Sequence, residues 1–121
     1  MKGIYKMKII KGQGYCITYD PETATVTCTG GLRLRGRAEY TPISELLSAV
    51  AEEKPETITL CMQGLKKMNS SGIGIFSDFV VKGRALKVSK IIVRGTRRFP
   101  WQKKSLGTLQ WLMPELKLNI E

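Results

Sequence analysis

Polar and apolar residues alternate through the first third of the chain, a pattern typical of half-buried strands. Residues 15–19 and 24–29 show this alternation and are separated by an Asp-Pro-Glu-Thr turn, which predicts an antiparallel hairpin. The two glycines at 30–31 break or bulge the second strand, and the alternation resumes over 32–35. Residues 1–14 precede the hairpin as an N-terminal extension or an additional strand.

Helical spacing replaces the alternation from Thr41 onward. Thr41 is a favourable N-cap and Pro42 suits the first helical position, so we predict a helix that starts there and ends before Pro55. The patterns that follow predict a strand over 57–62, a helix from residue 70, a strand over 90–94, a helix from residue 100 and an edge strand over 116–120. This order predicts an α/β fold in which about three helices pack on a mixed sheet with an N-terminal hairpin.

The length and composition fit one domain over residues 1–121, because 42% of the residues are apolar. No apolar run approaches the roughly 18 residues that cross a bilayer, and lysines interrupt the apolar N-terminus, so we predict neither a membrane span nor a signal peptide. Cys16, Cys28 and Cys61 form no closely spaced pair. We interpret them as small, mostly buried hydrophobic residues in a reducing cytoplasm.

Groups for acid–base, nucleophilic or metal chemistry are scarce. The chain has no histidine, and its two aspartates, Asp20 and Asp78, lie in unrelated contexts. No carboxylate pair, Ser-His or Cys-His arrangement, or metal-ligand spacing can be assembled. We therefore predict a protein that is not an enzyme and needs no metal or cofactor. A lysine or tyrosine base is the alternative that these residues leave open.

The net charge of +10 lies almost wholly in the second half of the chain. Residues 1–60 carry eight Lys/Arg and seven Asp/Glu, a net of +1, whereas residues 61–121 carry twelve and three, a net of +9. Such a basic half is typical of proteins that meet an acidic protein, nucleic acid or an anionic membrane surface. A solvated basic face that keeps the protein soluble is the alternative, and the charge does not decide between them.

The turn Met68-Asn69-Ser70-Ser71-Gly72 joins the strand at 57–62 to the next helix and is the main candidate site. Asn69 and Ser70 can each cap that helix with a side-chain oxygen, and the glycine after them permits close approach of other groups. A phosphate on a serine here would be tolerated by its own helix, yet it would add bulk and about two negative charges to a docking surface. A plain helix cap is the simpler interpretation.

The segment Leu-x-x-Met-Asn-Ser-Ser-Gly-Ile-Gly-Ile-Phe, with the apolar strand before it, resembles the STAS domain of bacterial anti-sigma factor antagonists. That family has an apolar residue, Asp-Ser-Ser-Gly, and then an apolar-Gly-apolar stretch. The preceding hairpin and the order of helices and strands match as well. The resemblance covers residues 15–115, and its specific part is Met68–Ile75. It implies a STAS-like domain and a cytoplasmic bacterial regulator of transcription.

The resemblance also implies how such a regulator works. STAS antagonists bind an anti-sigma factor that is a serine kinase of the GHKL ATPase type, and the kinase ends the complex by phosphorylating the first serine of the pair. That serine is Ser70 here, and a PP2C-type phosphatase would restore binding. Ser71 and Gly72 match the residues that shape the turn. Asn69 stands where the family has aspartate, which keeps the capping oxygen and removes the charge.

A basic and aromatic segment over residues 94–104 is the second candidate site. If the STAS-like fold is right, this segment lies at the same end of the sheet as Ser70, and it could hold a phosphate or meet an acidic partner. A nucleic-acid-binding surface is the alternative function, although no nucleic-acid motif is present. The residues concerned are Arg94, Arg97, Arg98, Phe99, Trp101, Lys103 and Lys104, of which Arg97, Arg98, Phe99 and Trp101 are the candidate partner contacts.

The aromatic residues also have a purely structural interpretation. Trp101 and Trp111 could pack the last helix onto the sheet, because large aromatic side chains are usually highly buried. We expect this packing for Trp111, and we leave both interpretations open for Phe99 and Trp101.

Overall fold

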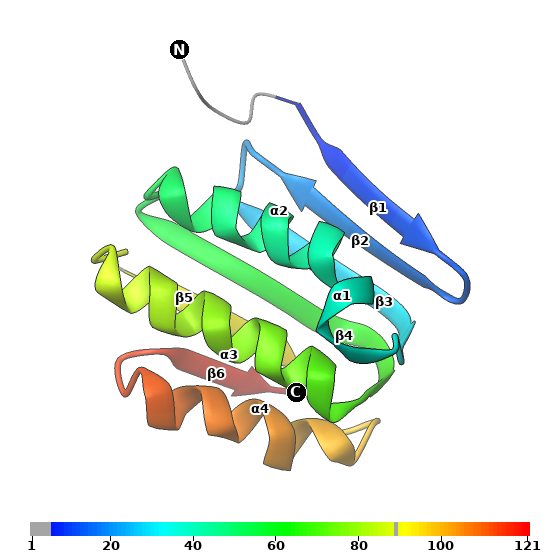
Figure 1. Ribbon diagram of the computed structural model, residues 1–121. Helices are drawn as coiled ribbons and strands as arrows, with labels where there is room; N and C mark the ends of the chain where they lie inside the picture. The colour runs from blue at the N-terminus through cyan, green and yellow to red at the C-terminus, as the bar shows by residue number, and fades with distance from the viewer. Residues whose placement is uncertain (1–5, 89) are drawn as a thin grey trace.

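A mixed sheet whose strands lie in the order of the sequence carries helices on one of its faces (Figure 1). The computed structural model describes residues 6–88 and 90–121, and within them the sheet has six strands. The strands are β1 (Lys8–Gly12), β2 (Tyr15–Asp20), β3 (Thr25–Leu32), β4 (Thr57–Met68), β5 (Lys90–Gly95) and β6 (Lys117–Ile120). The helices are α1 (Gly36–Glu39), α2 (Thr41–Glu52), α3 (Ser70–Ala85) and α4 (Trp101–Leu112).

The chain connectivity explains why the helices share one face. The first three strands pair antiparallel through hairpins, whereas β3, β4, β5 and β6 pair parallel in sequence order. Right-handed crossovers that always advance in the same direction place every connecting helix on the same side. Along β4, Ile58, Leu60 and Met62 are accordingly fully buried, while the alternate residues on the other face remain partly exposed.

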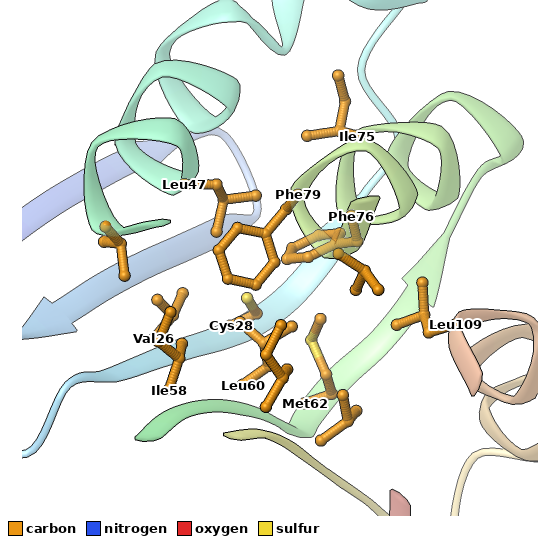
Figure 2. Close-up of a cluster of buried hydrophobic side chains, with 14 of the residues drawn as sticks. Val26, Cys28, Leu47, Ile58, Leu60, Met62, Ile75, Phe76, Phe79 and Leu109 are labelled. Atoms are coloured by element: carbon orange, nitrogen blue, oxygen red, sulfur yellow. The ribbon is translucent and has the colours of Figure 1, made fainter. Parts of the chain in front are cut away.

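The core lies between the sheet and the three longer helices. Figure 2 shows the ring of Phe79 between Leu47 of α2 and the sheet residues Cys28 and Leu60, with Phe76 beside it. Both phenylalanines are at most 3% exposed. The apolar face of α3 therefore fixes this helix, and the turn at its start, against the centre of the sheet.

The hairpin, the mixed sheet and the edge strand at the C-terminus are confirmed. Residues 8–12 form β1, which pairs with β2, so this part of residues 1–14 is an additional strand. Residues 1–5 of that predicted extension lie outside the described residues. The expected irregularity at the two glycines is confirmed as a register shift between Gly30 and Gly31.

Two local predictions around the first helix were wrong. β3 ends at Leu32, and the short helix α1 follows in place of the continued strand. Thr41 does not cap α2 but is its first residue. Tyr40 is both the C-cap of α1 and the N-cap of α2. Tyr40 is fully buried, and its side chain makes no capping hydrogen bond to α2.

The prediction that Trp111 packs the last helix onto the sheet was also wrong, because its side chain is 87% exposed. The buried face of α4 consists of Gln102, Leu106 and Leu109. Trp111 follows Leu109 by two residues, which turns it by roughly 200° around the helix axis and directs it to solvent.

Candidate functional site

The long strand β4 carries the candidate site beyond the rest of the sheet. Its pairing with β5 ends at Cys61 and Arg94, although the strand continues to Met68. Pairing with β3 continues along this extension, so that Leu32 lies opposite Met68. Backbone pairing with β3 therefore supports one side of the turn that follows. On the β5 side, no strand among the described residues pairs with the end of β4.

Gln102 of α4 supplies that support on the β5 side. It is fully buried, and its Nε2 donates to the carbonyl oxygens of Met62 at 2.7 Å and Leu65 at 2.9 Å. Its Oε1 accepts the backbone N–H of Thr96 at 2.7 Å. One side chain thus pairs two carbonyl groups of the β4 extension, beyond the end of its pairing with β5, and one N–H of the chain after β5.

Asn69, between β4 and α3, is held by three segments at once. Its Oδ1 accepts the N–H of Gly72 at 3.0 Å and lies 2.8 Å from the hydroxyl of Tyr40. Its Nδ2 donates to the carbonyl oxygen of Leu34 at 2.8 Å, and its backbone N–H donates to Leu32 at 3.0 Å. The residue is therefore both the N-cap of α3 and the anchor that ties the helix to the chain after β3.

The chemistry of these partners fixes the orientation of the Asn69 amide. The Gly72 N–H can only donate, so it requires the oxygen, and the Leu34 carbonyl can only accept, so it requires the nitrogen. A carboxylate at this position could serve the first partner but not the second. The structure thus gives a local reason for asparagine where the resembling family has aspartate.

Tyr40 and Gly72 complete the inner side of the turn. The Tyr40 hydroxyl also lies 3.0 Å from the carbonyl oxygen of Leu32, and burial raises the pKa of this hydroxyl. Gly72 is buried, and a Cβ there would come within 2.8 Å of the Tyr40 oxygen and 2.6 Å of Met68 Cγ. Gly72 therefore makes room for the protein's own side chains.

Ser70 occupies the outer side of the turn. It is the first residue of α3 and is exposed, whereas Ser71 and the flanking Met68 and Asn69 are only partly exposed. The turn therefore presents one accessible serine on a backbone that its neighbours hold in place. Of the five predicted residues Met68–Gly72, four reach the surface to some degree and Gly72 does not.

Exposed cations surround this serine on two sides, and we call them the basic collar. They are Arg33, Arg35 and Arg37 of the chain after β3, and Lys66 and Lys67 at the end of β4. The pairing of Gly31 with Lys67, and the bonds from Asn69 to Leu32 and Leu34, bring the two segments together. Two acidic residues reduce the positive charge of the basic collar. Asp78 pairs with Arg37 at 2.6 Å, and Glu39 accepts a hydrogen bond from the backbone N–H of Arg35.

The basic and aromatic segment, residues 94–104, runs from the end of β5 into the start of α4. Because β4 and β5 are parallel, the segment lies at the same end of the sheet as Ser70, as expected. Trp101 is partly buried, and its indole N–H donates to the carbonyl oxygen of Lys66 at 2.7 Å. Phe99 is also partly buried, with the exposed Arg98 guanidinium 5.7 Å from its ring centre, and Arg97 is exposed. The arginines face solvent, Trp101 packs against the core, and Phe99 is partly buried.

The described residues offer little for catalysis or metal binding. Among residues 6–88 and 90–121, no group of three or more His, Cys, Asp or Glu side chains could hold a metal ion. No helix within those residues is long and apolar enough to span a membrane. The exposed cations of the basic collar lie in the segments next to the Ser70 turn, an arrangement suited to recognition of negative charge.

Several residues of the site escaped the sequence analysis. Tyr40 bonds Asn69, 29 residues away. Gln102 bonds Met62 and Leu65, 40 and 37 residues away. Nothing next to Tyr40 or Gln102 in the sequence marks that role. The collar did have a signal, since arginine recurs at every second position from Arg33 to Arg37. The near-zero net charge of residues 1–60 does not indicate this local cluster of arginines.

Comparison with solved structures places this arrangement among known folds. The crystal structure of an anti-sigma factor antagonist from Mycobacterium paratuberculosis superposes with a TM-score of 0.57 over 93% of this chain and 84% of that one, at 14% sequence identity. The chain has a STAS-like fold. No family model matches the sequence, and no curated protein matches it significantly. The STAS-like sheet thus places the Met68–Gly72 turn at the end of its longest strand.

Proposed function

We propose that this STAS-like domain is a non-catalytic regulator that binds a partner protein through the Ser70 turn and the basic collar, and that phosphorylation of Ser70 ends the complex. The observation that carries the proposal is the single exposed serine on a turn locked from beneath by Asn69 and Tyr40. A turn that is already ordered loses little conformational entropy on binding. A modified Ser70 can change the surface without unfolding the domain.

The charge of the site indicates the kind of surface that the partner presents. The basic collar complements an acidic patch, and such complementarity accelerates association and excludes wrong partners. A phosphate on Ser70 adds about two negative charges in the middle of the collar, so it weakens attraction to that patch. Phosphorylation and binding are therefore opposed by electrostatics as well as by bulk.

The partner that fits this scheme is an anti-sigma factor of the GHKL serine-kinase type, with a PP2C-type phosphatase that reverses the modification. Support comes from the resemblance at Met68–Ile75 and from the fold shared with an anti-sigma factor antagonist. In this scheme the domain acts in the cytoplasm and controls transcription by occupying the anti-sigma factor. Arg97, Arg98, Phe99 and Trp101 would form the outer part of the same interface.

A nucleic-acid-binding role for residues 94–104 has weaker support. Single-strand binding proteins rely on aromatic rings that are free to stack on bases. The partial burial of Trp101 and Phe99, and the use of the Trp101 indole N–H by Lys66, leave mainly the arginines for such contacts.

The experiment incubates the domain with ATP and the purified GHKL-type kinase encoded nearest to it, followed by mass spectrometry of the phosphorylated residue. We expect one phosphate, on Ser70, and none in Ser70→Ala. Ser71→Ala is the matched control, because Ser71 is the neighbouring and less exposed serine, and it should be modified like the wild type. Absence of phosphate on Ser70, or equal modification of Ser70→Ala, would refute the proposed site.

A further inference from the structure

Ser70, Gly74 and Asp78 form one stripe along α3, because residues four apart lie above one another on a helix. Arg37 of α1 lies across the middle of this stripe. Its Nη1 binds Asp78 Oδ2 at 2.6 Å, and its Nη2 would lie 3.2 Å from a Cβ placed on Gly74. The guanidinium therefore rests on the helix surface where Gly74 has no side chain, with Asp78 on one side and Ser70 on the other.

The spacing of the stripe sets how far Arg37 has to move to meet Ser70. Four helical residues rise about 6 Å, so the Cα atoms of Ser70 and Asp78 are about equally far from that of Gly74, in opposite directions. Side chains on a helix lean toward its N-terminus, so Asp78 leans toward Gly74 and Ser70 leans away from it. A phosphate on Ser70 extends the serine side chain by two bonds, Oγ–P and P–O, so its terminal oxygens can turn back along the stripe. The exchange of partners then requires the flexible Arg37 side chain to swing from Asp78 toward the start of α3.

We propose that Arg37 reads the phosphorylation state of Ser70: it pairs with Asp78 when the serine is free and moves to the phosphate when the serine is modified. This inference rests on the proposed function, in which Ser70 is phosphorylated. It adds that the phosphate recruits an arginine of the basic collar and so removes that arginine from the surface offered to the partner.

The relative strength of the two pairs favours the exchange. The Arg37 and Asp78 side chains are 65% and 60% exposed, and ion pairs in that setting contribute little. A phosphoserine dianion carries nearly twice the charge of a carboxylate and accepts two parallel hydrogen bonds from a guanidinium. Arg33, Arg35, Lys66 and Lys67 are exposed in the segments next to the turn and add positive potential, while Glu39 and Asp78 oppose it.

The test places phosphoserine at position 70 during translation, so it needs no kinase, and follows the phosphate by ³¹P NMR from pH 4.5 to 8. An arginine paired with the phosphate lowers its second pKa. We expect Arg37→Gln to raise that pKa by at least half a unit, which is about a threefold increase in proton affinity. Arg35→Gln is the matched control, a collar arginine off the stripe, and should shift it much less.

Two glycine substitutions provide a second, independent test with the same measurement, the second pKa of the phosphate. Gly74→Ala places a methyl group 3.2 Å from Nη2 of the guanidinium and crowds its position beside Asp78 but keeps the cation, so it should change the phosphate pKa much less than Arg37→Gln does. Gly107→Ala, in the interior of α4 with no atom within 4 Å of the added Cβ, is the control and should leave it unchanged. No shift in Arg37→Gln, or equal shifts in Arg35→Gln, would overturn the inference.

These outcomes are separate from those of the proposed function. If the kinase modifies Ser70 while Arg37→Gln leaves the phosphate titration unchanged, the regulator stands and the arginine exchange is wrong. If Arg37→Gln shifts the titration but no kinase modifies Ser70, the exchange is a property of the fold and the proposed function is wrong.

Discussion

The amide of Asn69 allows a sharp test of how the turn is held. N69D exchanges the Nδ2 group for an oxygen of nearly the same size, 2.8 Å from the carbonyl oxygen of Leu34. The acceptor for the Gly72 N–H is kept. At neutral pH the substitution therefore removes one hydrogen bond and sets a carboxylate oxygen against a carbonyl oxygen with no proton between them.

The magnitude follows from this exchange. A lost hydrogen bond that leaves a buried partner unsatisfied costs about 1–3 kcal/mol. The new negative charge at the start of α3 offsets about 0.3–1 kcal/mol of that through the helix dipole. We therefore expect the free energy of unfolding at pH 7 to fall by about 1.5 kcal/mol.

The loss should depend on pH, because a protonated carboxyl can again donate to Leu34. This raises the pKa of the introduced carboxyl in the folded state above its unfolded value of about 3.9. The folded state then binds more protons than the unfolded state, so stability falls as the pH rises through the folded pKa. The deficit relative to the wild type should shrink from about 1.5 kcal/mol at pH 7 to below about 0.5 kcal/mol at pH 4.

Urea unfolding of the wild type and N69D at pH 4, 5, 6 and 7 measures this directly. Asn69→Ser is the control, because it keeps a capping oxygen, loses the bond to Leu34 and cannot titrate in this range. Its deficit should be the same at every pH. Equal stability of N69D and the wild type at pH 7, or a deficit of N69D that does not change with pH, would refute our account of the amide.

Three further predictions concern the scaffold. Gln102→Leu leaves three backbone groups without their side-chain partner, so the free energy of unfolding in urea should fall by about 3 kcal/mol or more; a loss below about 1 kcal/mol would contradict this. Gly107→Ala should raise the free energy of unfolding by about 0.5–1 kcal/mol, because alanine favours a helix and the added Cβ has no atom within 4 Å. A decrease in the free energy of unfolding would contradict this. Burial raises the pKa of the Cys28 thiol, so this residue should react with Ellman's reagent at pH 8 at least roughly 100-fold more slowly in the folded than in the unfolded protein; similar rates would contradict its burial.

Local patterns were sufficient for most of the fold. The hairpin of β2 and β3 follows from alternation and turn residues, and the start of α3 follows from the capping preference of Asn69. Each of these depends on residues within a few positions of one another. The order of the strands reflects the tendency of consecutive strands to lie beside one another, and the handedness of the connections then places the helices on one face.

The remaining features depend on contacts between distant segments. β4 extends to Met68 because β3 pairs with it and Gln102 covers its other edge, although Lys66 and Lys67 make this stretch look like a loop. Trp111 faces solvent because of its angle on α4, which the tendency of tryptophan to be buried does not predict. The exact role of Asn69 depends on the carbonyl of Leu34, which lies 35 residues away.

The central claim is that the unmodified Ser70 turn binds a partner and that a phosphate on Ser70 ends binding. Isothermal titration of the purified GHKL-type kinase, loaded with ADP, with the unmodified domain and with the domain carrying phosphoserine at position 70 tests it most directly. We predict binding of the unmodified domain and at least a tenfold weaker affinity of the phosphorylated one. Equal affinities, or binding of the phosphorylated domain alone, would contradict the account.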